Sequence, residues 1–264
     1  MTGKNIRNMG VPSETAMSIA ARMGAYDIVA SEDVIIPSRK PVSFGITSTN
    51  GDITPCNTRL GGWNPCTLGG ISGRISADVD WESSPRKLNF VTFTRDEEGE
   101  KTIIPKGTRL MTTSQKTSAD WNVIFVGTNG GWSKDNLTSS EHLNNGDEAK
   151  LVSLIEDMVN HAPYQEKCVI IGITAGADRW TTANSMLAEK FGDRFIDAKP
   201  YFSSEQSLAD AGITPTSEDI KAIAEKKVPP SLLDDTLHFN DAGYKLMAKL
   251  VYNKLIELGF ENEQ

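Results

Sequence analysis

This sequence has few cysteines, no long apolar run and no excess of basic residues, and each of these features excludes a class of protein. Three cysteines in 264 residues are too few for a disulfide framework, and no CxxC or HExxH pattern indicates a metal site. No window approaches the apolar length of a membrane span, and the first residues contain no apolar leader. The sequence therefore predicts a soluble chain without a signal peptide, and it leaves the cellular location open.

Acidic residues outnumber basic ones, 35 to 27, which gives a net charge of -8 and a pI near 5.0. Nucleic-acid partners need a clustered basic surface, and here the lysines and arginines are scattered among more acids. We therefore expect no nucleic-acid partner. The hydrophobic fraction of 38% is typical of globular proteins, and the length suits one large domain or one domain with an insert.

The cysteines themselves are ambiguous. Cys168 lies in the apolar run from Lys167 to Ile173, where a small buried hydrophobic residue is expected. Cys56 and Cys66 could form a bridge, but their spacing alone leaves the pairing open.

The first 30 residues predict a strand at Asn5–Met9, a helix at Ser13–Gly24 with Ser13 as N-cap, and a strand at Tyr26–Ala30. Such alternation is typical of a parallel sheet with crossover helices. Residues 31–116 differ, since they are rich in proline and glycine and show no helical apolar period. They predict a small β-rich module that interrupts an α/β domain of residues 1–30 and 117–264.

The alternation of strands and helices returns after residue 117. The expected strands are Val123–Val126, Val169–Ile173 and Arg194–Asp197, and the expected helices are Glu148–His161, Thr182–Phe191, Ser203–Ala211, Ser217–Lys226 and Asn240–Leu258. The last helix carries a long apolar face and ends at Gly259.

A candidate acid–base pair lies just before the last helix, in the segment Asp235-Thr236-Leu237-His238. A catalytic histidine needs a carboxylate at Nδ1 to fix its tautomer, and a three-residue offset in a tight turn can supply one. The same pattern also fits a surface aspartate followed by a histidine packed at a helix start.

Two further segments follow predicted strands, where a parallel sheet forms its ligand crevice. In Gly127-Thr128-Asn129-Gly130-Gly131 the Asn129 amide could donate to an anionic intermediate, or Asn129 could simply adopt a left-handed turn conformation. In Asn8-Met9-Gly10 the Gly10 amide could join the same oxyanion hole, or the segment could be only a turn.

Together these segments resemble the conserved blocks of the SGNH/GDSL hydrolase family over nearly the whole α/β part. Residues Asn8–Thr15 (NMGVPSET) are similar to the second block, Gly127–Asn129 to the third, and Asp235–Tyr244 (DTLHFNDAGY) to the fifth. The fifth match is the most specific, because the HFNDAGY stretch and the amphipathic helix after it both agree.

The resemblance implies an SGNH-hydrolase-like, flavodoxin-like fold: a parallel sheet between helices in three layers, α/β/α, with the β-rich module inserted. It implies catalytic roles for His238 and Asp235 and an oxyanion hole formed by Gly10 and Asn129. It implies no metal and no cofactor.

One block departs from the family. The Gly-Asp-Ser turn that carries the nucleophilic serine occurs nowhere in the chain, because each Gly-Asp pair is followed by Ile53, Glu148 or Arg194. We expect the nucleophile upstream of residue 1, on a strand–turn–helix segment of about 30 residues or more. Ser13 is a weaker substitute, since an N-cap oxygen should be bonded to backbone amides.

The expected function is hydrolysis of acetyl or other small esters, with esters of carbohydrates favoured, by a chain that is inactive without its nucleophile. The alternative is a non-catalytic binding protein of the same fold that acts through the β-rich module. The fold alone does not choose the substrate.

Overall fold

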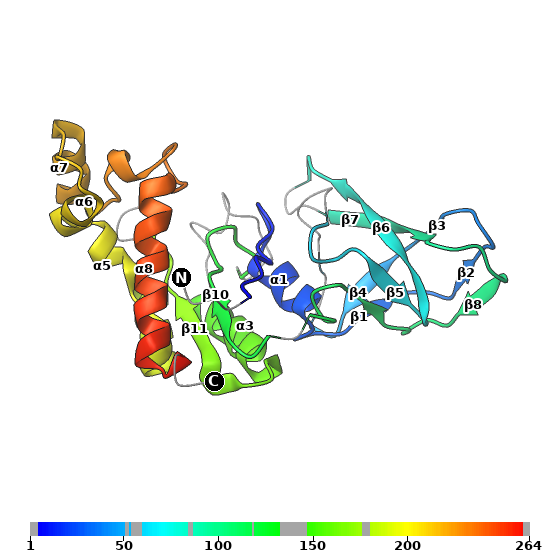
Figure 1. The fold of residues 1–264 in the computed structure, drawn as a ribbon. Coiled ribbons are helices and arrows are strands. Elements are labelled where there is room, and N and C mark those ends of the chain that lie inside the picture. Colours follow the sequence, from blue (N-terminus) through cyan, green and yellow to red (C-terminus); the bar gives the residue numbers. More distant parts are fainter. Residues whose placement is uncertain are drawn as a thin grey trace. The chain divides into compact units, whose positions relative to one another are not determined.

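A computed structural model describes residues 5–50, 53, 60–83, 87–117, 119–132, 147–175 and 180–260 (Figure 1). The chain forms two compact units. The β-rich unit comprises Met1–Ser118 and Asn129–Asn145, and the α/β unit comprises Ala119–Thr128 and Gly146–Gln264. Within the described residues, no helix combines the length and the apolar character needed to cross a lipid bilayer.

The β-rich unit contains one helix and nine strands in its described part. The helix is α1 (Ala16–Met23), and the strands are β1 (Ile28–Ala30), β2 (Val34–Ile36), β3 (Val42–Phe44), β4 (Ile46–Ser48), β5 (Cys66–Leu68), β6 (Ile71–Asp80), β7 (Lys87–Arg95), β8 (Thr102–Ile104) and β9 (Leu110–Met111). All regular elements described between residues 31 and 116 are strands, as the sequence texture predicts.

Antiparallel pairing builds every sheet of this unit. Five strands form one sheet in the order β3-β7-β6-β5-β9, while β1 pairs with β4 and β2 with β8. The inward side chains are apolar, and Phe93, Leu68 and Leu110 are almost fully buried. Alternation of inward and outward side chains thus gives the unit its own core.

Three expectations about the N-terminal elements differ from the structure. Residues Asn5–Met9 form no strand, because no described strand pairs with them, and Ile6 is 82% exposed. The strand expected at Tyr26–Ala30 does form, as β1, but it is antiparallel to β4 and lies outside any parallel sheet. The helix begins at Ala16 with Thr15 as its N-cap, so the N-cap expected at Ser13 is also wrong.

A buried ion pair connects α1 to the strands of the β-rich unit. The Glu14 carboxylate lies 2.6 Å from Nε of Arg22, and both side chains are at least 96% buried. Glu14 also accepts hydrogen bonds from Trp63 Nε1 at 3.1 Å and from Ser18 Oγ at 2.9 Å. Arg22 donates to Ser114 Oγ at 2.8 Å. Segments that are distant in the sequence therefore share one buried polar network.

This network explains why residues 1–30 belong to the β-rich unit rather than to the α/β domain of residues 1–30 and 117–264 expected from the sequence. The Thr112 hydroxyl donates to the Arg22 carbonyl, and Gln115 Nε2 donates to the Ala21 carbonyl at 3.2 Å. Charged groups buried this deeply are stable only when each is paired. Helix α1 and the strands that it contacts therefore belong to the same unit, and the boundary between the units does not lie at residue 30.

The α/β unit contains a parallel sheet and its flanking helices. Its elements are β10 (Asn122–Ile124), α3 (Glu148–His161), η1 (Gln165–Lys167), β11 (Cys168–Ile171), α4 (Thr181–Phe191), η3 (Gly192–Arg194), β12 (Phe195–Ile196), α5 (Ala198–Phe202), α6 (Glu205–Ala211), α7 (Ser217–Ala224), η4 (Pro230–Leu232) and α8 (Asp241–Glu257). Each strand and helix expected after residue 117 is present, with ends displaced by a few residues at most, and α5 is added before α6.

The three strands lie in the order β10-β11-β12, and both pairings are parallel. Helices α3 and α4, which make the two crossovers, pack against each other. Val169 and Ile171 of β11 share a core with Leu246 and Met247 of α8. Because side chains alternate along a strand, Ile170 points to the opposite face, where it is also fully buried. This confirms a mixed α/β fold.

The two described cysteines are buried thiols. Cys168 is fully buried, as its apolar run predicts, and burial raises its thiol pKa to about 11. Burial raises the pKa of Cys66 to about 12, and its Sγ lies 3.5 Å from the Gly73 carbonyl oxygen. Cys56, the other half of the possible bridge, lies outside the described residues.

We predict that Arg22→Met destabilises the β-rich unit by about 3 to 5 kcal/mol, because it leaves the Glu14 carboxylate buried without a counter-charge. Urea unfolding measures the loss. Arg39→Met is the matched control, since Arg39 is 74% exposed in its ion pair with Glu98 and should cost about 0.5 kcal/mol or less. Equal costs for the two variants would contradict the network described above.

Candidate functional site

The segment from Leu232 to Asn240 closes on itself just before α8. Leu233 and Phe239 form an antiparallel bridge, and the Asp234 amide donates to the His238 carbonyl at 2.9 Å. The Asn240 amide donates to the Leu232 carbonyl at 3.0 Å. These bonds hold Asp235 and His238 in a short loop whose ends are fixed.

Within this loop the Asp235 carboxylate contacts the His238 imidazole, which confirms the contact expected from their three-residue spacing. His238 Nδ1 lies 2.7 Å from Asp235 Oδ2. The other carboxylate oxygen accepts from the backbone amides of Leu237 and His238, both at 2.7 Å. A hydrogen bond at Nδ1 directs the proton-accepting role of the ring to Nε2. The pair has the geometry of a general base and its orienting carboxylate.

These hydrogen bonds change the acidity of Asp235. The His238 amide, the His238 ring and the Leu237 amide together lower its pKa from 3.8 to about 2. A lowered pKa means that the bonds stabilise the loop while the carboxylate is charged, above pH 4, and that this contribution is lost as the pH falls toward 2. Because 55% of the Asp235 side chain is exposed, hydrogen bonding rather than burial sets its pKa.

The HFNDAGY stretch fixes the start of α8 next to this loop. Phe239 is buried, and its ring centroid lies 4.5 Å from that of Phe202. Asn240 caps the helix by accepting from the Gly243 amide at 3.1 Å, and its Nδ2 donates to the Ser231 carbonyl at 3.0 Å. A Cβ at Gly243 would lie 2.6 Å from the Leu232 carbonyl oxygen. Glycine therefore permits the close approach of helix and loop.

The dyad loop lies near the carboxyl end of the parallel sheet. Strand β12 leads directly into α5, and the last residue of α5, Phe202, contacts Phe239. Helix α8, which begins two residues after Phe239, packs on β11 and β12 (Figure 1). The carboxyl ends of parallel strands are where α/β folds bind ligands. The loop that carries His238 thus packs, through Phe239, against the helix that follows β12.

The two predicted oxyanion donors come from adjacent segments of the β-rich unit. The Ala16 amide donates to the Gly130 carbonyl at 2.9 Å, and a Cβ at Gly131 would lie 2.6 Å from Cβ of Thr15. Arg22 Nη2 donates to the Met9 carbonyl at 2.7 Å and holds the chain next to Gly10. The buried network therefore also supports the segment that carries Gly10.

From the sequence we expect the Gly10 amide to be free, but in the structure it donates to Asn8 Oδ1 at 2.9 Å. Asn129 does not take the left-handed conformation that the alternative interpretation required. The glycines around it do, with φ of 118° at Gly127, 78° at Gly130 and 82° at Gly131. Gly10 and Asn129 belong to one unit and His238 to the other, so their convergence stays a prediction.

Ser13 differs from its expected role. Thr15 and not Ser13 caps α1, and Ser13 is exposed with a φ of 62°. Its hydroxyl is therefore not committed to helix capping. The left-handed region is sparsely populated by residues other than glycine, asparagine and aspartate, and such residues often occur at functional sites.

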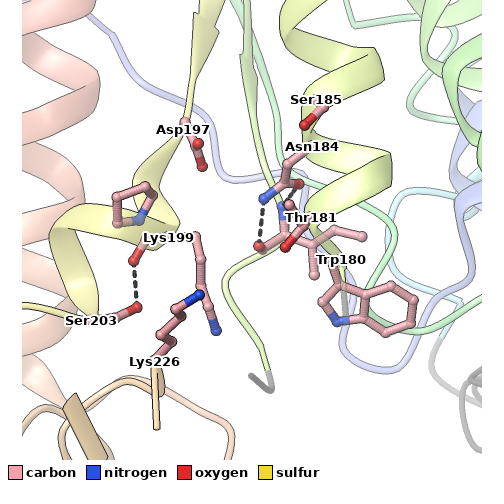
Figure 2. A pocket seen from close by; sticks show the side chains of 10 residues that line it. Trp180, Thr181, Asn184, Ser185, Asp197, Lys199, Ser203 and Lys226 are labelled. Atoms are coloured by element: carbon pink, nitrogen blue, oxygen red, sulfur yellow. Dashed lines mark hydrogen bonds between the residues drawn. The ribbon is translucent and has the colours of Figure 1, made fainter. Parts of the chain in front are cut away.

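A cavity that the sequence did not reveal lies at the carboxyl ends of β11 and β12. It has a volume of about 690 Å³, and its lining includes Asp197, Lys199 and Lys226 (Figure 2). Asp197 follows β12 directly. Desolvation raises its pKa, while a hydrogen bond with the Lys199 backbone and the charge of Lys199 lower it. In the sequence, only the charged residues after β12 could have indicated this cavity, because most of its other lining residues come from helices elsewhere in the chain.

Among the described residues, no cluster of three or more His, Cys, Asp or Glu side chains is suited to a metal ion.

We predict that Asp235 titrates with a pKa of about 2, measured from its carboxyl carbon shift by NMR. In His238→Ala the value should rise, because one acceptor bond is lost, but it should stay below 3.8 because two amides still donate. His161→Ala is the control and should leave Asp235 unchanged. An ordinary aspartate titration in the unsubstituted protein would refute the dyad geometry.

We predict that Gly243→Ala destabilises the α/β unit by about 1 to 3 kcal/mol, because the new methyl group overlaps a backbone oxygen that has little room to move. Helix propensity alone would favour alanine by about 1 kcal/mol. Ala248→Gly, on an exposed position of the same helix, measures that propensity term in chemical denaturation. A stabilising Gly243→Ala would show that the loop and helix are not in close contact.

Comparison of the chain with protein-family models, with curated proteins and with solved structures gave no match. The proposed function therefore rests on the geometry of the site and on the sequence motifs.

Proposed function

We propose that this chain is part of a serine ester hydrolase of the SGNH type, with an SGNH-like three-layer α/β/α fold interrupted by the β-rich module. The single observation that carries the proposal is the 2.7 Å contact between His238 Nδ1 and Asp235 Oδ2 in a loop at the start of α8. A histidine held in this way, 67% exposed, can exchange a proton with a substrate or a nucleophile.

In the proposed mechanism a serine hydroxyl attacks the ester carbonyl carbon while His238 Nε2 takes its proton. Asp235 holds the ring and stabilises the imidazolium that forms. The tetrahedral oxyanion accepts hydrogen bonds from the Asn129 side-chain amide and the Gly10 backbone amide. His238 then gives the proton to the leaving alcohol, and water hydrolyses the acyl-enzyme by the same steps.

The Gly10 amide must exchange its present acceptor for this role. It donates to Asn8 Oδ1, an exposed bond between residues two apart. Catalytic hydrogen bonds often form only in the substrate complex. Rotation of the Asn8 side chain would release the amide without moving the backbone, which Arg22 holds at Met9.

The proposed substrates are acetyl or other small esters, with carbohydrate esters favoured. The cavity at the carboxyl ends of β11 and β12 supports a small, hydroxyl-bearing ligand better than a long acyl chain, because lysine, aspartate, serine and threonine side chains are among those that line it. An apolar tunnel would be needed to bury a fatty acyl group.

The test is hydrolysis of p-nitrophenyl acetate. Because the 264 residues contain no Gly-Asp-Ser turn, we expect the chain alone to be no faster than its His238→Ala variant. A longer version that carries this turn should be active and should lose activity about 10³-fold or more with His238→Ala, since triad members act as a unit. His161→Ala is the control and should change neither.

Two outcomes would contradict the proposal or part of it. If the longer version hydrolyses the ester equally well without His238, the dyad has no catalytic role and the proposed function fails. If the 264-residue chain alone is active and His238→Ala abolishes that activity, the nucleophile lies within it. Ser13→Ala then tests the residue with the exposed, left-handed backbone position.

A further inference from the structure

Asp219 of α7 is a fully buried carboxylate that the proposed mechanism does not use. It closes a capping box with Thr216, whose amide and hydroxyl both donate to Asp219 Oδ2 at 2.9 Å. The Asp219 amide donates in return to Thr216 Oγ1 at 3.2 Å. Aspartate is almost never fully buried unless it is paired. The capping box occupies only one carboxylate oxygen, so it accounts neither for the burial nor for the use of Oδ1.

The remaining partner of Asp219 is Ser231, which lies twelve residues further along the chain. The Ser231 amide donates to Oδ1 at 3.0 Å, and its hydroxyl donates to Oδ2 at 2.8 Å. Ser231 is the middle residue of η4, and the dyad loop, residues 232–240, begins at the next residue. Two of the four hydrogen bonds to this carboxylate therefore come from the segment that leads into the dyad loop.

These hydrogen bonds keep Asp219 charged although it is buried. Desolvation by itself raises the pKa of a carboxyl group, but the bonds from Ser231 and Thr216 outweigh it and lower the pKa of Asp219 from 3.8. Hydrogen bonds to an ionised acceptor are stronger than those between neutral groups. Ser231 is therefore attached to α7 by two strong bonds, one from its backbone and one from its side chain.

Ser231 and its neighbour extend this attachment to the far end of the dyad loop. The Ser231 carbonyl accepts from Asn240 Nδ2 at 3.0 Å, and the Leu232 carbonyl accepts from the Asn240 amide at 3.0 Å. Asn240 also caps α8 by accepting from the Gly243 amide at 3.1 Å. Both ends of the loop thus meet at Ser231 and Leu232, and Asp219 holds this junction against α7.

Asp219 and Asp235 differ in what they fix. Asp235 bonds only groups of the loop itself, namely the His238 ring and the amides of Leu237 and His238. It orients the imidazole within the loop but does not attach the loop to the rest of the unit. That attachment comes from Phe239, which packs on Phe202, and from Asp219 at the amino end of the loop.

The attachment of the loop matters because a general base acts over a short distance. Catalytic groups have to be held within about 0.5 Å of the productive geometry. A displacement of about 1 Å can lower the rate about 100-fold. A dyad with correct internal geometry in a displaced loop would therefore be a poor catalyst.

We propose that Asp219 is a positioning residue of the candidate site, which acts through Ser231 to set where the dyad loop holds His238. The effect on the loop is a property of the 264-residue chain. The effect on ester hydrolysis rests on the proposed function.

Two matched variants test the proposal. Ser231→Ala and Thr216→Val each remove one hydroxyl group that donates to Asp219 Oδ2, at 2.8 Å and 2.9 Å, but only Ser231 adjoins the dyad loop. In the 264-residue chain, amide hydrogen exchange followed by NMR measures how often the loop opens, at the Asp234 and Asn240 amides that close it.

We expect Ser231→Ala to speed exchange at these two loop amides about tenfold or more relative to the amide of Ile170 in the buried strand β11. Thr216→Val should leave that ratio unchanged. The pKa of Asp235 should stay at about 2 in Ser231→Ala, because the three bonds that lower it lie within the loop. A loss of general stability would instead speed exchange at Ile170 by the same factor as in the loop.

The second measurement is hydrolysis of p-nitrophenyl acetate by the longer version that carries the Gly-Asp-Ser turn. Ser231→Ala should lower kcat about tenfold or more and leave KM nearly unchanged, because a displaced base slows the chemical step and not substrate binding. Thr216→Val should change neither constant.

Equal loop exchange in the two variants, acceleration at Ile170 that matches the loop, or an unchanged kcat in Ser231→Ala of an active longer version would each overturn the proposal. The exchange measurement does not depend on catalysis. If Ser231→Ala loosens the loop but no version shows His238-dependent hydrolysis, the role of Asp219 in holding the loop stands and the proposed function fails. If hydrolysis depends on His238 but the loop does not respond to Ser231→Ala, the proposed function stands and the role of Asp219 is rejected.

Discussion

The candidate site depends on one carboxylate that accepts three hydrogen bonds within four residues. Asp235 bonds the imidazole of His238 and the amides of His238 and Leu237, so the loop and the ring are fixed by the same group. Protonating or removing this carboxylate would free both at once. The loop needs this internal support because the two side chains are more than half exposed and gain little from packing. Burial begins one residue later, at Phe239, which joins the loop to the core of the α/β unit.

A second charged pair has the corresponding role in the β-rich unit. Glu14 and Arg22 are buried together, and from this pair hydrogen bonds reach Met9, Trp63 and Ser114. The segment that carries Gly10 is therefore held by the same group that attaches α1 to the strands. Each unit thus positions its own part of the proposed catalytic apparatus by a charged group with several partners, and the two parts must meet for ester hydrolysis to occur.

Local signals in the sequence predicted the α/β unit well. Helix α3 was expected at its observed bounds, because an aspartate N-cap and a regular apolar face define it, and the Asp235–His238 contact follows from a three-residue offset. The N-terminal elements were not predicted well, since their structure depends on distant partners. Trp63 and Ser114, which lie 49 and 92 residues from the groups they bond, give no signal next to α1. The left-handed backbone of Lys226 and the cavity it lines depend on tertiary packing in the same way.

The central prediction is that the dyad and the oxyanion donors form one site, and a spin label at position 129 tests it most directly. The chain has only three histidines, so the ring signals of His238 can be followed by NMR in an Asn129→Cys variant whose native cysteines are replaced by alanine. We expect the oxidised label to broaden the His238 ring signals strongly and its reduction to restore them. Ring signals of His238 that stay sharp with the oxidised label would show that Asn129 and the dyad do not share a site, which would contradict the account.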